Sequence, residues 1–136
     1  MTALQLVEGS ASGEVLACAE GLSFWGGVDP LTGRIIDVHH PDHGKSVTGK
    51  VLTMPTSRGS CSGSGVLLEL ALNGLAPAAL VFSEDEETLT LGALVAGRVF
   101  DCGLPVVRLG LSDFQALGQA TSADLSDGRL RAGALD

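Results

Sequence analysis

A short serine-rich segment is the part of the chain best suited to chemistry. Residues 57–64 read Ser-Arg-Gly-Ser-Cys-Ser-Gly-Ser, and they lie between an apolar run that predicts a buried strand and another that predicts a helix. Free backbone N–H groups at the start of a helix favour negative charge nearby. They can stabilise Ser60 as it becomes an alkoxide, or help to hold an anionic substrate. Arg58 adds a permanent positive charge for a carboxylate or a phosphate.

The same segment also has a purely structural interpretation. Serine is a preferred residue at a helix N-cap, and turns rich in glycine and serine commonly join a strand to a helix. The phosphate-binding pattern that ends in Gly-Lys-Ser/Thr is absent. The hydrolase pattern Gly-x-Ser-x-Gly is absent in the strict sense, although residues 59–63 look superficially similar, and a hydrolase also needs His and Asp partners that a sequence cannot pair. Spacing alone therefore favours the structural role.

Cysteine and histidine supply weaker candidates for a site. The three cysteines, Cys18, Cys61 and Cys102, are far apart, which argues against a disulfide framework and against a self-contained zinc site. We interpret Cys61 as a small packed residue rather than a nucleophile or a ligand. Three histidines lie within residues 39–43, but a His-x-x-His spacing inside a Pro-Asp-Gly turn is weak evidence for a metal. His40, which precedes a proline, either fixes the turn or reaches a substrate, and we predict no metal bound by this chain.

The composition excludes two classes of partner. The net charge of −8 argues against a nucleic-acid-binding protein, which normally needs a basic face. No stretch approaches the roughly 18 continuous apolar residues of a membrane span. Residues 1–9 lack a basic region followed by an apolar run, so we expect no signal peptide and a cytoplasmic location.

The elements that position the serine segment follow a strand–helix alternation. With 136 residues, 45% of them hydrophobic, the chain predicts one domain over residues 1–136 with an aliphatic core. The order of elements favours an α/β layer. The acidic residues 84–87 predict a solvated first turn of the second helix. The predicted strands are residues 13–19, 34–38, 50–55, 78–82, 104–109 and 127–134, and the predicted helices are residues 66–74, 88–97 and 111–117.

Three longer motifs resemble a known family. They are residues 23–33 (Ser-Phe-Trp-Gly-Gly-Val-Asp-Pro-x-Thr-Gly), residues 36–46 (Ile-Asp-x-x-His-Pro-x-x-Gly-x-Ser) and residues 59–64 (Gly-Ser-x-x-Gly-Ser). In this order they are similar to the small subunit, or swivel domain, of aconitase X, over residues 13–107. The resemblance implies a swivelling β/β/α domain, as in the C-terminal swivel domain of aconitase. It also implies a hydro-lyase reaction and a large-subunit partner that carries an iron–sulfur cluster.

The resemblance also implies roles for individual residues. In the aconitase group a swivel-domain serine removes the proton, and the Gly-Ser motif assigns that role to Ser60. The cluster ligands belong on the large subunit, so the three cysteines of this chain are expected to be non-ligands. Phe24 and Trp25 are expected to form an exposed docking patch for the large subunit or, alternatively, part of the core. The residues expected to bind substrate are Arg58, Gly59, Ser62, Ser64 and His40.

Two substrates are known for the family, cis-3-hydroxy-L-proline in bacterial catabolism and 5-phosphomevalonate in archaeal isoprenoid synthesis. A chain rich in Ala, Leu and Gly looks bacterial, which favours hydroxyproline as the small hydroxy-acid substrate. Two other function classes remain open. One is a swivel module that docks a partner without chemistry of its own, and the other is a phosphohistidine carrier, whose motif the histidines at 39–43 do not resemble.

Overall fold

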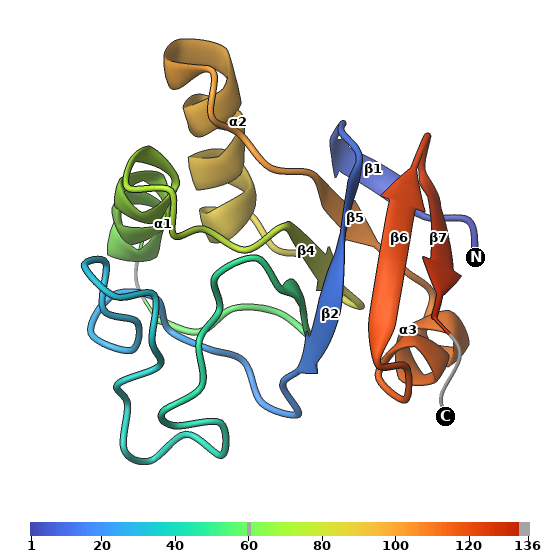
Figure 1. Cartoon of the computed structure of the whole chain (residues 1–136), viewed down its shortest axis with the longest axis horizontal. Helices are drawn as coiled ribbons and strands as arrows, with labels where there is room; N and C mark the ends of the chain where they lie inside the picture. The colour runs from blue at the N-terminus through green and yellow to red at the C-terminus, as the bar shows by residue number, and fades with distance from the viewer. Residues whose placement is uncertain (60, 134–136) are drawn as a thin grey trace.

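The computed structural model describes residues 1–59 and 61–133. Within them, seven strands form a sheet in the order β1-β5-β4-β3-β2-β6-β7 (Figure 1). The strands are β1 (Leu4–Val7), β2 (Ala11–Ala17), β3 (Val51–Met54), β4 (Ala79–Phe82), β5 (Val106–Arg108), β6 (Ser122–Ser126) and β7 (Arg129–Ala132), and the helices are α1 (Ser62–Leu72), α2 (Thr88–Phe100) and α3 (Leu111–Leu117).

The middle of the sheet is parallel and buried on both faces. Strands β2, β3, β4 and β5 pair in parallel, whereas β1, β6 and β7 pair antiparallel at the two sides. Every residue of β3 and β4 is buried, as expected for strands that are covered on both faces.

Alternate residues of these strands enter two separate cores. Leu52 and Leu80 pack with α1 and α2, while Val51 and Val81 pack with α3 and the β6–β7 hairpin. Figure 1 shows α1 and α2 together at one side of the molecule and the hairpin with α3 at the other. The sequence periodicity of two thus places one helical layer and one curled β layer on opposite faces.

Most of the predicted elements are confirmed with shifted ends. The apolar runs at 50–55, 78–82 and 104–109 are β3, β4 and β5, and the third predicted helix coincides with α3. The strands β1 and β6 were not predicted, because β1 is largely exposed and β6 reads Ser-Ala-Asp-Leu-Ser with only alternate residues buried. The predicted strand at 127–134 begins two residues late as β7, because Asp127 and Gly128 form the hairpin turn with φ of 52° and 75°.

One predicted strand is wrong. Residues 34–38 form no strand, and only isolated bridges join Ile35 to Val28 and Arg34 to Ser46. They belong instead to a long loop between β2 and β3, and buried side chains of this loop pack into the core. Turns at Gly33 and Gly44, where φ is +76° and +89°, interrupt the extended conformation at both sides. The side chains of this loop that pack into the core are Leu22, Phe24, Val28, Ile35 and Val47.

Two further corrections concern helix starts. Helix α1 begins at Ser62 rather than at residue 66, so Ser62 and Ser64 lie in its first turn. The acidic residues before α2 are not all solvated, because Glu86 is buried and bonded to the start of the helix. None of the helices in the described residues is long and apolar enough to cross a membrane.

Candidate functional site at the carboxyl edge of the parallel strands

The serine segment leaves the sheet where three neighbouring parallel strands end together. The register pairs Ala17 of β2 with Thr53 of β3, and Met54 of β3 with Phe82 of β4. Loops that follow adjacent parallel strands meet at one edge of a sheet, the usual place for a ligand in open α/β folds. The segment after β3 therefore lies between the segment after β2 and the segment after β4.

On the β2 side, the serine segment is in close backbone contact with residues 21–23. The N–H of Arg58 donates to the carbonyl of Leu22 at 3.3 Å. A Cβ on Gly59, whose φ is +93°, would lie 2.4 Å from Oγ of Ser23. A Cβ on Gly21 would lie 2.5 Å from the carbonyl oxygen of Thr56. Glycine is therefore required at both positions for the two segments to approach this closely.

On the β4 side, residues 83–86 form four hydrogen bonds with residues 55–57, which lead into the exposed part of the serine segment. The N–H groups of Ser83 and Glu84 donate to the carbonyl of Pro55 at 3.2 and 3.0 Å. The hydroxyl of Thr56 donates to the carbonyl of Asp85 at 3.0 Å. The hydroxyl of Ser57 donates to the carboxylate of Glu86 at 2.8 Å.

Glu86 links this contact to the start of α2. Its carboxylate accepts the N–H of Leu89 at 2.8 Å and the N–H of Thr90 at 3.0 Å, and the hydroxyl of Thr90 at 3.2 Å. A buried carboxylate is stable here because it satisfies orphan donors of a helix start and receives the Ser57 hydroxyl. This role of Glu86 was not predicted from the sequence. The available signal was an acidic residue placed three positions before a helical apolar residue, as in a helix cap.

The exposed tip of the segment, as far as the structure describes it, consists of Arg58, Gly59, Cys61 and Ser62. Ser60 falls outside the described residues, and its two neighbours, Gly59 and Cys61, are both exposed. Arg58 is exposed as well, and its aliphatic carbons cover Gly21, where a Cβ would lie 2.8 Å from Cγ of the arginine.

The two other predicted serines lie in the first turn of α1. Ser62 is exposed there. The hydroxyl of Ser64 donates to the carbonyl of Cys61 at 2.8 Å, and the Ser64 backbone lies against Gly92 of α2. The expected packing of Cys61 is wrong, since this side chain is exposed at the N-cap. A cysteine at a helix N-cap points away from the core when the helix packs through later positions, and here those are Leu67 and Leu70.

Among the described residues, the first turn of α1 carries no negative charge of its own. Cys61 makes no side-chain capping bond, and the first turn holds no acidic residue. The first N–H groups of the helix are therefore not neutralised by a carboxylate of their own turn. Such a helix start favours an alkoxide or a substrate carboxylate beside it.

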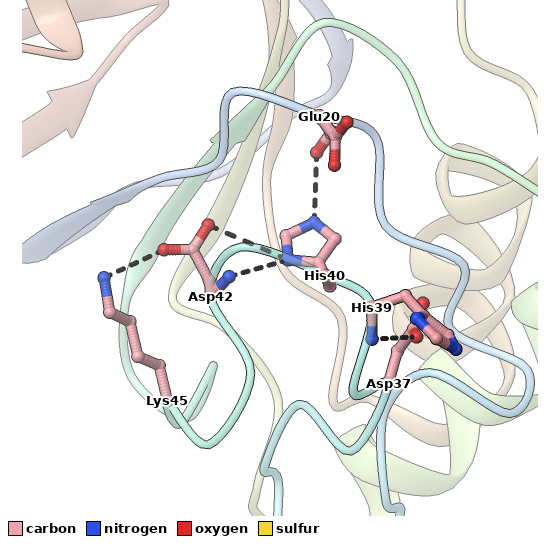
Figure 2. Close-up of polar contacts among 6 residues, drawn as sticks. All are labelled: Glu20, Asp37, His39, His40, Asp42 and Lys45. Carbon is pink, nitrogen blue, oxygen red and sulfur yellow. Dashed lines mark hydrogen bonds and ion pairs between the residues drawn. The ribbon is translucent and has the colours of Figure 1, made fainter.

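The three histidines do not converge, and only His40 is buried. Its Nδ1 accepts the N–H of Asp42 at 3.0 Å, and its Nε2 lies 3.3 Å from the carbonyl of Glu20 (Figure 2). His39 and His43 are exposed. Of the two roles expected for His40, this geometry supports the fixing of the turn, while a contact with substrate stays a prediction.

Cys18, His40 and Asp42 form a buried cluster that sequence spacing did not group. Their potential ligand atoms all lie within 4.8 Å of one another. Burial, and then the negative Asp42 carboxylate, raise the pKa of the Cys18 thiol to about 12, which keeps it neutral. The Asp42 carboxylate is paired with the Lys45 ammonium at 2.8 Å. The residue types would suit zinc, but the ring nitrogens and the carboxylate already have partners, so we interpret the cluster as a hydrogen-bond network.

Comparison with known families identifies the fold type. The family model of the aconitase X swivel domain matches residues 1–131. The chain belongs to the aconitase X swivel-domain family. The resemblance that the three motifs carried is thus confirmed.

Relatives of this swivel domain are dehydratases or subunits of dehydratases. The cis-3-hydroxy-L-proline dehydratase of Pseudomonas aeruginosa is 53% identical over 125 residues, covering 92% of this chain and 21% of the relative. That of Hypocrea jecorina is 53% identical over 111 residues, covering 82% of this chain and 19% of the relative. The phosphomevalonate dehydratase small subunit of Methanothermobacter thermautotrophicus is 40% identical, covering 90% of this chain and 92% of the relative. The chain therefore spans about one fifth of the two hydroxyproline dehydratases and nearly all of the small subunit.

Solved structures agree with the swivel-domain fold. The crystal structure of Thermococcus kodakaraensis aconitase X in its holo-form matches with a TM-score of 0.81 at 31% identity, covering 98% of this chain and 97% of that one. A solution NMR structure of a UPF0107 protein matches with a TM-score of 0.83 at 30% identity, covering 98% of each chain. The predicted swivel-type α/β fold is confirmed.

Proposed function

We propose that this chain is the small, swivel subunit of a two-chain hydro-lyase of the aconitase X type. The observation that carries the proposal is the match of the aconitase X swivel domain to residues 1–131. The structure supports it independently, because residues 55–59 are held on both sides at the carboxyl edge of three parallel strands and lead into an exposed tip. An exposed tip that is held rigidly at its base suits an active site completed by a second chain.

Ser60 is the proposed base. A hydro-lyase removes a proton from one carbon and a hydroxyl from its neighbour, and in this proposal Ser60 takes the proton. A serine hydroxyl is too weak an acid to be a useful base unless its alkoxide is stabilised. The N–H groups at the start of α1 and the guanidinium of Arg58 provide that stabilisation, and exclusion of water on docking strengthens it.

The remaining predicted site residues have supporting roles in this proposal. Arg58 and Ser62, both exposed beside the tip, hold the polar groups of the substrate. Gly59 permits the close approach to Ser23, and Ser64 fixes the turn by its hydrogen bond to Cys61.

We propose that the iron–sulfur cluster expected for this family is bound by the large subunit. Such clusters are held by several thiolates. Among the described residues, the one group able to hold a metal contains a single cysteine, and that thiol is neutral and buried. The described residues therefore do not fit a cluster, and the roles above do not depend on one.

The proposed substrate is cis-3-hydroxy-L-proline. The chain is 53% identical to two cis-3-hydroxy-L-proline dehydratases and 40% identical to the Methanothermobacter phosphomevalonate dehydratase small subunit. This difference agrees with the compositional preference for the bacterial substrate. 5-Phosphomevalonate is the alternative.

The test is a coupled dehydratase assay on the chain reconstituted with its large subunit. We expect turnover of cis-3-hydroxy-L-proline, and turnover of 5-phosphomevalonate alone would overturn the substrate. Ser60→Ala should abolish activity, while Ser62→Ala, the matched control two residues further along, should retain a measurable rate. If Ser60→Ala keeps activity within a few-fold, Ser60 is not the base and the chain acts as a docking module.

A further inference from the structure

The serine segment lies against residues 18–23, and three interactions fix the position of these residues. At their start, the N–H of Cys18 donates to the carbonyl of Thr53 at 2.8 Å. At their end, the side chain of Leu22 is fully buried. Between these points Glu20 is exposed, and its carbonyl lies 3.3 Å from Nε2 of the His40 ring (Figure 2).

The geometry defines which nitrogen of His40 carries the proton. Nδ1 lies 3.0 Å from the N–H of Asp42, which can only donate, so Nδ1 is the acceptor. In the neutral ring the proton is then on Nε2, which donates to the carbonyl of Glu20. His40 thus uses one nitrogen within its own turn and the other across to residues 18–23.

The turn that carries His40 is itself well braced. The N–H of His40 donates to the carbonyl of Asp37 at 3.1 Å, and the N–H of Lys45 donates to the carbonyl of Asp42 at 3.1 Å. The Asp42 carboxylate holds the Lys45 ammonium at 2.8 Å. Because the ring is buried on this braced turn, its Nε2–H is a fixed point of attachment for Glu20.

A continuous set of contacts leads from this attachment to the serine segment. Residue 21, next to Glu20, touches Thr56, and residue 22 accepts the N–H of Arg58. Residue 23 lies against Gly59, the immediate neighbour of Ser60. Movement of the Glu20 carbonyl would therefore shift the surface that sets the conformation of residues 56–59.

We propose that His40 is a positioning residue for the serine segment, acting through its Nε2–H bond to the Glu20 carbonyl rather than by touching the substrate. The kinetic part of this proposal rests on the proposed function. A misplacement of about 1 Å far from the reacting atoms can lower the rate by about a hundred-fold. We therefore expect loss of the hydrogen bond between His40 and Glu20 to lower kcat more than it weakens the binding of substrate.

A matched pair of variants separates the two nitrogens. His40→Gln keeps an N–H donor near the position of Nε2, whereas His40→Asn keeps an acceptor near Nδ1, able to bond the N–H of Asp42, but no donor that reaches the position of Nε2. In the reconstituted enzyme we expect His40→Asn to lower kcat by about ten- to a hundred-fold with KM changed less than about three-fold. His40→Gln should restore kcat to within about three-fold. The control is His43→Asn, at an exposed histidine of the same turn, which should change nothing.

A second readout does not depend on catalysis. In the full chain, amide hydrogen exchange at residues 20–23 and 56–59 should accelerate in His40→Asn and remain near wild type in His40→Gln. Equal kcat in the two variants, or unchanged exchange in His40→Asn, would overturn the proposal. If no dehydratase activity exists, the proposed function fails while the exchange measurement still decides the positioning role.

Gly21→Ala covers the case in which a histidine variant does not fold. Its Cβ would lie 2.5 Å from the Thr56 carbonyl and would push the same two segments apart with His40 intact. We expect the same selective loss of kcat and the same faster exchange at residues 56–59. Wild-type kcat in Gly21→Ala would overturn the proposal.

Discussion

Replacement of Glu86 by alanine should be among the most damaging single changes on the β4 side of the site. It removes a buried acceptor from the N–H groups of Leu89 and Thr90 and from the hydroxyl of Ser57. A hydrogen bond to a charged group contributes about 1.5–3 kcal/mol and a helix cap about 1 kcal/mol. The bonds share one carboxylate and are not additive. We therefore expect a loss of about 3 kcal/mol, or about 10 °C in Tm for a domain of this size.

The assay is urea unfolding followed by far-ultraviolet circular dichroism, with the slope m compared between variants. Glu86→Gln keeps the shape and one acceptor oxygen, and it should lose about 1 kcal/mol. Glu84→Ala is the control, since this neighbouring carboxylate is exposed, and it should leave the midpoint unchanged. A midpoint for Glu86→Ala that matches that of Glu84→Ala would refute the inference that the carboxylate anchors α2 and the serine segment.

Three further predictions follow from the same structure. A thiol reagent at neutral pH should label exposed Cys61 and spare Cys18, whose pKa is raised to about 12 by burial, and mass spectrometry reads the sites. Gly59→Ala should destabilise the chain and lower activity because the φ of Gly59 is +93°, whereas Gly65→Ala, in open space on α1, should raise the free energy of unfolding by about 0.5–1 kcal/mol. Rapid labelling of Cys18 would contradict the first expectation, and a stabilised Gly59→Ala variant would contradict the second. The hydrogen bond to the Asp42 carboxylate and its negative charge raise the pKa of Lys45 above its ordinary value of 10.5. The wild type should therefore be more stable than Lys45→Gln by a constant amount below pH 10.5, and this difference should vanish as the pH rises through the raised pKa.

Local patterns in the sequence were sufficient to predict an element where the composition of one segment indicates its burial. The apolar runs at 50–55 and 78–82 predicted buried central strands because a strand covered on both faces needs no polar residues. The same patterns failed at residues 34–38, where an apolar-looking stretch is broken by turns and pinned by distant core contacts. Phe24 and Trp25 were expected to be either both exposed in a docking patch or both in the core, but Phe24 is buried and Trp25 is 63% exposed.

The sequence by itself determined the family and the layered α/β fold, because three ordered motifs and a periodicity of two or 3.6 are properties of the chain read in order. It also predicted the serine segment as the place for chemistry. Only the tertiary structure decided how that segment is held. The Glu86–Ser57 bond joins positions 29 residues apart, and the His40–Glu20 bond joins positions 20 apart. Such contacts exist because the carboxyl ends of β2, β3 and β4 meet at one edge, and no spacing along the chain encodes that meeting.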